Sequence, residues 1–420
     1  LRDEGSQRRS VNRGMNMNTK KFQLPAHAPL LGRKAWTAFL LALIAVGFLA
    51  PVLNLLVPVG NPLHLSDFAV SLIGKIMCYA ICALAMDLIW GYTGILSLGH
   101  GLFFALGGYV MGMYLMRQIG QDGNYKSHLP DFMVFLDWKE LPWHWTLSDS
   151  FVATLLLVVL VPGFIAFVFG YFAFRSRIKG VYFSIITQAM TYAAMLLFFR
   201  NETGFGGNNG FTDFKRIVDL PIATPGMRMV LFVLTGLTLL GFFLFSRWLV
   251  GSKYGRVLMA IRDAETRVMF SGYSPLPYKL SIWVISAVMC GIARALYVPH
   301  VGIINPGEMS AANSIEMAVW AAVGGRGTLI GPIVGAFLVN GAKSWLTVTA
   351  PEFWLYFLGA LFIVVTLYLP NGVIGLLRTR QGWLKYFRHS REGGNPDPGS
   401  PVKPEMTAPQ PSTDQKGGAA

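Results

Sequence analysis

The stretch SFVATLLLVVLVPGFIAFVFGYFAF, residues 150–174, decides the fold class. It carries no charged side chain and is long enough to cross a membrane, because a helix rises about 1.5 Å per residue and the hydrocarbon core is about 30 Å thick. Similar apolar runs recur along the chain. They lie at 36–59, 68–89, 95–118, 181–199, 229–250 and 280–303, followed by less regular runs at 313–323, 329–346 and 353–369. These runs predict an all-α, polytopic membrane protein.

The composition supports this class. Of the 420 residues, 53% are hydrophobic and only 13% are charged, whereas about a quarter of the residues in a soluble domain are charged. A membrane β-barrel is excluded because its strands would alternate in segments of about ten residues. Cys78, Cys82 and Cys290 lie inside apolar runs, so we expect buried small side chains rather than a disulfide framework or a metal site.

The basic residues predict the orientation of the chain. The net charge is +14, and 23 of the 35 Lys and Arg residues fall in four segments. These are residues 1–34, 175–180, 251–279 and the tail from 370 onward. Since cytoplasmic loops are rich in Lys and Arg, these segments and both termini are expected in the cytoplasm. The basic excess is therefore an orientation signal, and no nucleic-acid partner is expected.

Termini on one side require an even number of crossings, and two arrangements satisfy this. In the preferred one, about ten helices span the membrane and 313–323 crosses as a short helix. In the other, eight helices span it and 313–346 forms a re-entrant pair. The predicted domains are a basic segment 1–34, whose first 14 residues are left out of the fold prediction, a membrane domain 35–377 and a cytoplasmic tail 378–420. The tail is basic at first and is then expected to be disordered from about Arg391.

The sequence lacks the motifs of common enzymes. It contains no P-loop, no His-Glu-x-x-His pair and no Gly-x-Ser-x-Gly elbow. We therefore expect a protein that is not an enzyme, holds no metal or cofactor, and draws any energy from another subunit.

Charges inside the spans are costly and therefore informative. Lys75 and Asp87 are too far apart on one helix to pair, so we expect Lys75 to snorkel and Asp87 to be solvated at the cytoplasmic interface. Arg294, Glu316 and Lys343 are expected to face a cavity or to pair with acids or with one another.

Glycine-rich breaks interrupt the runs at 90–101, 204–210 and 324–328. Non-helical backbone at membrane depth is tolerated where protein or a water-filled path covers it, and transporter sites often lie at such breaks. At Gly107, Gly108 and Gly112, close helix packing is the better interpretation. The candidate substrate-path residues are Tyr92, Thr93, Ser97, His100, Asn208, Asn209, Asn313 and Glu316.

The loop at 251–279 predicts a short amphipathic helix. Val257, Leu258, Ile261, Val268 and Met269 recur near helical spacing and charged residues lie between them. Because both charge signs are present, a protein partner is preferred to the membrane surface. The outer loop at 119–149 carries Trp138, Trp143 and Trp145, which predicts an aromatic belt at the headgroup level, with a docking surface as the alternative.

Residues 255–278 resemble the coupling loop of permease subunits in ABC importers of the branched-chain amino acid type (LivM-like), with Glu265 and Gly272 at motif positions. Residues 87–109 and 321–332 also resemble this family. Residues 180–188, 198–214 and 301–306 resemble its urea-permease branch, UrtC. The resemblance covers roughly residues 30–385. This sequence departs from the family pattern at Arg267, Val268 and Arg294, where small residues are expected.

The resemblance implies a multi-pass permease of the bacterial inner membrane that works by alternating access. Its partners would be a second, UrtB-like permease, two ATPase subunits that bind the ATP, and a periplasmic binding protein. The implied coupling residues are Arg262, Asp263, Glu265, Arg267 and Gly272. The preferred substrate is urea, a neutral solute that needs hydrogen-bonding groups without a charge clamp. A branched-chain amino acid and an ATP-independent urea channel are the alternatives.

Overall fold

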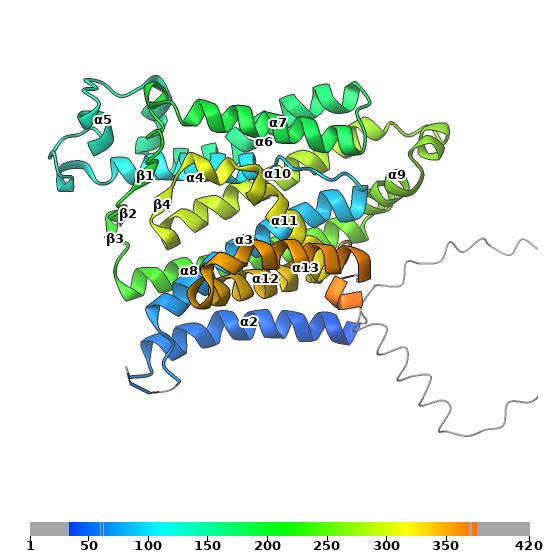
Figure 1. Cartoon of the computed structure of the whole chain (residues 1–420), viewed down its shortest axis with the longest axis horizontal. Coiled ribbons are helices and arrows are strands. Elements are labelled where there is room, and N and C mark those ends of the chain that lie inside the picture. The colour runs from blue at the N-terminus through cyan, green and yellow to red at the C-terminus, as the bar shows by residue number, and fades with distance from the viewer. Residues whose placement is uncertain (1–32, 59, 62, 369–371, 376–420) are drawn as a thin grey trace, which may run out of the picture. The chain divides into compact units, whose positions relative to one another are not determined.

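The computed structural model describes residues 33–58, 60, 61, 63–368 and 372–375, all within one compact unit of the chain. The predictions for residues 1–32 and for the tail beyond 375 lie outside these residues. Figure 1 shows the bundle that the helices form. The helices are α2 (Arg33–Leu55), α3 (Asp67–Thr93), α4 (His100–Arg117), α5 (Asp131–Phe135), α6 (Phe151–Arg175), α7 (Val181–Phe198), α8 (Pro225–Gly251), α9 (Lys253–Phe270), α10 (Pro275–Val301), α11 (Ala311–Gly324), α12 (Ile330–Thr349) and α13 (Trp354–Tyr368).

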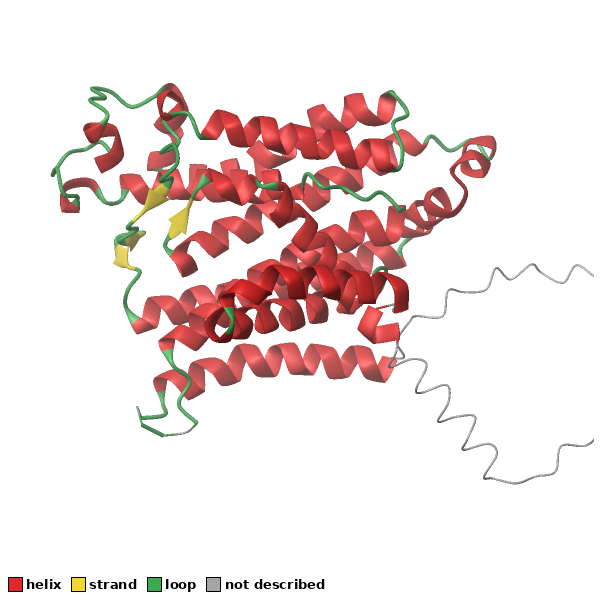
Figure 2. Ribbon diagram, viewed as in Figure 1, coloured by secondary structure: helices red, strands yellow, loops and turns green. Residues whose placement is uncertain are grey.

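Short elements join these helices. Among the described residues, the 3-10 turns are η1 (Gly120–Asp122), η2 (Trp143–Asp149), η3 (Asn201–Thr203), η4 (Pro306–Met309) and η5 (Pro351–Phe353). The strands are β1 (Phe211–Thr212), β2 (Arg216–Ile217), β3 (Leu220–Pro221) and β4 (Ile303–Ile304). β1 pairs antiparallel with β4, and β2 with β3, at one end of the bundle (Figure 2).

Each of the ten predicted apolar runs forms a helix within the described residues, which confirms the all-α, polytopic class. Six described helices are long and apolar enough to span a membrane: α2, α3, α6, α7, α8 and α10. With 14 residues, α11 is about 21 Å long and falls short of the hydrocarbon core. It forms a hairpin with α12, since Glu316 near its start contacts Lys343 near the end of α12.

Side-chain caps fix where several helices begin. Ser66, Ser150 and Thr224 each precede a helix and accept a hydrogen bond from the backbone N–H three residues later. Such caps satisfy donors that have no partner within the helix. The polar residue before each apolar run therefore sets the boundary of α3, α6 and α8.

The core lies around α3 and α10, which pack on each other, and α10 also packs on α4 and α6. Gly107 of α4 lies directly on the backbone of Gly291 in α10, where a Cβ atom would lie 2.1 Å from a carbonyl oxygen. This contact confirms the close packing predicted for Gly107. The three cysteines are fully buried and free, as predicted.

The two ends of the bundle differ. One end, here named the α9 end, holds α9 and the turns at 176–180 and 325–329, which face one another through contacts described below. The other, the α5 end, holds α5 and the strands (Figure 1). The described start of α2 lies at the α9 end (Figure 1), and Gly372 lies against Gly325. By the distribution of Lys and Arg, the α9 end is predicted to be cytoplasmic.

The aromatic belt prediction is wrong for Trp145. Its side chain is fully buried, and its indole N–H donates to the carbonyl oxygen of Gly204. Trp145 therefore ties the loop after α5 to the loop after α7. Trp143, in contrast, is 85% exposed, as an interfacial or docking residue would be.

Candidate functional site

The chain is broken inside the bundle between α3 and α4, where residues 94–99 are not helical. Side chains of α7 cover this segment. Ser184 Oγ donates to the carbonyl oxygen of Leu96, and Leu98 N–H donates to Thr187 Oγ1. Ser97 is fully buried and its hydroxyl oxygen accepts from Gly99 N–H. The protein thus supplies the hydrogen bonds that lipid cannot, as predicted for a break at membrane depth.

The first turns of α4 and α11 meet beside α10. His100 is fully buried and its Nε2 lies 3.0 Å from Ser286 Oγ of α10. Gly101 N–H donates to Ser314 Oγ in the first turn of α11. Asn313 donates to the carbonyl oxygens of Gly307 and Glu308 and so holds η4 against α11. Two helix N-termini therefore converge inside the bundle, where their positive ends favour an anionic group.

Asp87 forms a second cluster, and the prediction that the interface solvates it is wrong. Its carboxylate is fully buried and accepts the backbone N–H groups of Gly327 and Leu329, in the turn between α11 and α12. Tyr92 also belongs to this cluster rather than to the group around His100, since its hydroxyl donates to the carbonyl oxygen of Gly327. Thr93 is buried and donates to the carbonyl oxygen of Ile89 within α3. This cluster joins α3 to the α11–α12 turn.

The helix predicted in the 251–279 loop is α9, which is kinked at Ala264. Leu258, Ile261 and Val268 are buried as the amphipathic pattern predicts, but Met269 is exposed. Arg262 donates to the carbonyl oxygen of Gly91 at 2.7 Å and pairs with Asp263. α9 is therefore bonded to the same end of α3 that carries Asp87.

Glu265 follows the kink and ties α9 to two other elements. Its two carboxylate oxygens lie 2.7 Å from Lys179 Nζ, in the α6–α7 turn, and 2.5 Å from Lys279 Nζ, in α10. Arg267 is exposed. Gly272 ends the segment with a φ of +83°, a conformation that favours glycine. The predicted coupling residues thus divide into two that bind the bundle, Arg262 and Glu265, and others at its surface.

Glu265 makes folding stability depend on pH. Partial burial alone would raise the pKa of this carboxyl, but the bonds to Lys179 and Lys279 outweigh burial and hold the pKa below its usual value. An acid with a lowered pKa stabilises the fold above its unfolded pKa, about 4.3, and this stabilisation is lost as the pH falls through the folded pKa. We expect the melting temperature of the wild type to fall more steeply between about pH 5 and pH 3 than that of Glu265→Gln. Thermal melts of the detergent-solubilised chain measure this, with Glu202→Gln, an exposed glutamate, as control. Parallel curves for the wild type and Glu265→Gln would refute the role of these ion pairs.

The charged residues of the other spans are paired, as one of the predicted alternatives had it. Lys343 Nζ bonds both oxygens of Glu316, at 2.8 and 2.9 Å. Arg294 is fully buried, with its Nη2 3.1 Å from Glu308 Oε1 and its guanidinium 4.1 Å from the centre of the Tyr297 ring. Arg294 is therefore paired with the acid Glu308 and does not snorkel outward to the interface.

Two predicted path residues lie elsewhere. Asn208 and Asn209 are exposed in the loop after α7. The neighbouring Gly210 packs on the backbone of Ile304. This glycine-rich stretch is thus a packed loop at the α5 end, and its asparagines are not brought near His100 by any described contact.

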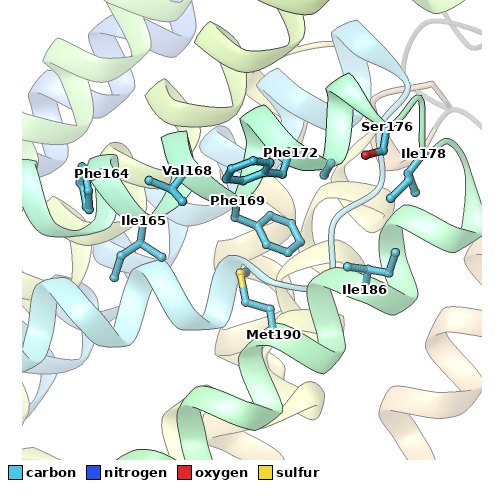
Figure 3. A pocket seen from close by; sticks show the side chains of 10 residues that line it. Phe164, Ile165, Val168, Phe169, Phe172, Ser176, Ile178, Ile186 and Met190 are labelled. Carbon is cyan, nitrogen blue, oxygen red and sulfur yellow. The ribbon is translucent and has the colours of Figure 1, made fainter.

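A cavity of about 540 Å³ lies between α6 and α7 (Figure 3). Its lining is apolar except for Ser176, and includes Phe164, Phe169 and Met190. It contains none of the predicted path residues. A polar solute would find few hydrogen-bonding groups there, so this cavity is not the candidate site.

The fold is that of a polytopic membrane protein in which helices broken inside the bundle connect to a kinked helix at one end, and transporters often build their sites at such breaks. The family model described as "Branched-chain amino acid transport system / permease component" matches residues 68–366. The chain belongs to this family. The prediction of a multi-pass protein of the bacterial inner membrane is thereby confirmed.

The curated proteins similar to this chain are named as permeases for different solutes. This chain is 24% identical to the high-affinity branched-chain amino acid permease LivM of Salmonella typhimurium over 347 residues, which cover 77% of this chain and 74% of the relative. Over 317 residues, 71% of this chain and 91% of the relative, it is 23% identical to LivH of the same organism. It is 28% identical to the ribose import permease RbsC of Bacillus subtilis over 149 residues, 33% of this chain and 42% of the relative. No solved structure matches the chain.

Proposed function

We propose that this chain is a permease subunit of an ATP-driven importer and that its solute is a branched-chain amino acid. The observation that carries the proposal is the family match together with relatives named for that solute. The convergence of two helix N-termini at His100 and Ser314 supports it, because the positive ends of helices suit a carboxylate.

In this proposal α9 receives the movement of an ATPase subunit. Phe270 is 93% exposed and Tyr273 is exposed beside it, and exposed aromatic side chains of this kind often anchor a protein partner. Arg262 passes the displacement to α3, and Asp87 passes it on to the α11–α12 turn. Since α11 carries Ser314, movement of α9 reaches the place where α4 and α11 meet.

The remaining partners are proposed by the same reasoning. The chain would pair with a second permease subunit and two ATPase subunits, and a periplasmic binding protein would deliver the solute at the α5 end. No ATPase motif was found in the sequence, so ATP would be bound by the partners.

Urea is the second candidate solute. The observation in its favour is the resemblance of residues 180–188, 198–214 and 301–306 to urea permeases. Urea is neutral, whereas Lys75 is a half-buried charge in the spanning helix α3 that has no ion pair among the described residues. Such a charge suits an amino acid better, so urea is the second candidate.

Competition of uptake distinguishes the two solutes. Cells that lack their own leucine importers would express this chain with its neighbouring transport genes. We expect a hundredfold excess of isoleucine to lower the uptake of labelled leucine at least tenfold, while the same excess of urea leaves it unchanged. Labelled urea uptake that urea but not isoleucine suppresses would favour the second candidate. Urea uptake that survives loss of the ATPase genes would instead indicate a channel.

A further inference from the structure

A second cavity, of about 450 Å³, lies between α3, α12 and the end of α10. Its volume is within the range of small-molecule sites. Lys75, Ser71, Asn340 and Ser344 line one part of it, and Phe68, Leu72, Ile76 and Val348 line another. The cavity is therefore amphipathic, with an ammonium group among its polar members.

Lys75 is a cation without a counter-ion at this cavity. Within the described residues it forms no hydrogen bond and no ion pair within 4 Å, and its Nζ lies 5.9 Å from the ring centres of Tyr79 and Tyr297. The other lysine of the cavity, Lys343, is neutralised by Glu316. One positive charge is thus left uncompensated in a spanning helix, where charges are costly and are usually partnered.

The surroundings of Lys75 keep it at the cavity. The hydroxyl groups of Tyr79 and Tyr297 bond to each other at 2.9 Å, so these rings form a fixed wall beside the lysine. Gly74, the preceding residue, makes room for the ring of His300, since a Cβ atom there would lie 2.6 Å from that ring. His300 is held in turn by Thr235 at 3.1 Å. The side chains beside Lys75 are therefore packed and hydrogen-bonded to one another.

We propose that this cavity, which neither His100 nor Ser314 lines, is a second position of the transported solute, separate from the place where α4 and α11 meet. Lys75 is the counter-ion of its carboxylate there, and the aliphatic part lies against Phe68, Leu72 and Ile76. The solute's identity rests on the proposed function. Lys75 matches the carboxylate of this solute, the side-chain oxygens of Ser71, Asn340 and Ser344 are acceptors for its ammonium group, and the apolar wall matches a branched hydrocarbon chain.

A phospholipid headgroup fits less well. Lys75 lies eight residues into the 27-residue α3, about 12 Å from its start. At about 40 Å, α3 is as long as the whole bilayer is thick, headgroups included, so Lys75 lies below the phosphate layer.

Protection from acetylation tests the site without transport. The purified chain in phosphatidylcholine nanodiscs would be treated with sulfo-NHS-acetate, and acetylation of Lys75 would be measured by mass spectrometry against exposed Lys139. We expect 4-methylpentanoate to slow acetylation of Lys75 at least fivefold and to leave Lys139 unchanged, while the neutral 4-methylpentanamide has no effect. Equal effects of acid and amide, or none, would overturn the proposal. The proposal would also be overturned if phosphatidylglycerol nanodiscs protected Lys75 from acetylation without any added solute, since a lipid phosphate would then be the occupant.

Transport kinetics provide the second test, and it remains decisive if Lys75 reacts too slowly to label. We expect Lys75→Met to raise the KM for leucine uptake at least tenfold, Lys75→Arg to restore it to within threefold, and the control Lys139→Met to leave it unchanged. A KM for Lys75→Met equal to that of the wild type overturns the site while the proposed function stands. Absence of leucine transport by the wild type refutes the proposed function, and the acetylation result still decides whether the cavity binds a carboxylate.

Discussion

Asp87→Ala is expected to lower the stability of this protein by about 3 kcal/mol or more. The carboxylate is fully buried and accepts two backbone N–H groups from the turn between α11 and α12. A hydrogen bond to a charged group contributes about 1.5 to 3 kcal/mol, and each donor left without a partner costs its desolvation. The substitution removes both bonds at once and separates α3 from the α11–α12 hairpin.

Thermal unfolding of the detergent-solubilised chain measures this effect. Asp87→Asn keeps the shape of the side chain but turns an amide N–H toward one of the donors, so its melting temperature should lie between those of Asp87→Ala and the wild type. Asp137→Asn, at an exposed position in the α5-end loop, is the control and should melt as the wild type does. A wild-type melting temperature for Asp87→Ala would show that the turn 327–329 does not depend on this acid.

Arg294→Met is expected to have the second large effect. Arg294 is fully buried between the rings of Phe104 and Tyr297, and Glu308 is its acid partner. Breaking a buried ion pair by removing one partner typically costs about 3 to 5 kcal/mol, because the other charge is left uncompensated. Glu308 is partly exposed, so we expect a loss of about 3 kcal/mol.

A double-mutant cycle separates the ion pair from the packing of the arginine. If the cost comes from the stranded charge, Arg294→Met combined with Glu308→Gln should recover more than half of the melting temperature that Arg294→Met loses. Additive losses in the double variant would mean that the guanidinium acts through its contacts with the two rings alone.

The helices were predictable because each apolar run carries its own signal. A run such as 150–174 must form a helix in lipid whatever its neighbours are, since its backbone groups have no other partner. Ser66, Ser150 and Thr224, which cap their helices, are local features as well. The close packing at Gly107 followed from the small size of the residue, although its partner Gly291 could not be named.

The site was predictable only in part, because its contacts join distant parts of the chain. Asp87 binds a turn 240 residues away, and no local pattern distinguishes such an acid from one at the interface. Asn208 and Asn209 were predicted from their place in a glycine-rich break and from their hydrogen-bonding side chains, and they are exposed in a loop. Lys75 shows the same limit, since the cavity beside it depends on α12 and on the position of His300.

The helix α9 was predictable, because residues 251–279 carry an amphipathic pattern of their own. The coupling role of Arg262 and Glu265 stays a prediction, and both residues contact the bundle. The kink at Ala264 was not predicted. The helical pattern of apolar residues continues across it, and the pattern therefore placed Met269 on the buried face where the structure exposes it.

In the proposed mechanism this chain moves an amino acid only when an ATPase subunit acts on α9. Uptake of labelled leucine into proteoliposomes tests it most directly, with the chain reconstituted either alone or with its second permease, ATPase subunits and binding protein. We expect uptake by the complete assembly that requires ATP on the α9 side, and none by the chain alone. Leucine uptake by the chain alone, or an assembly that moves urea and not leucine, would contradict it.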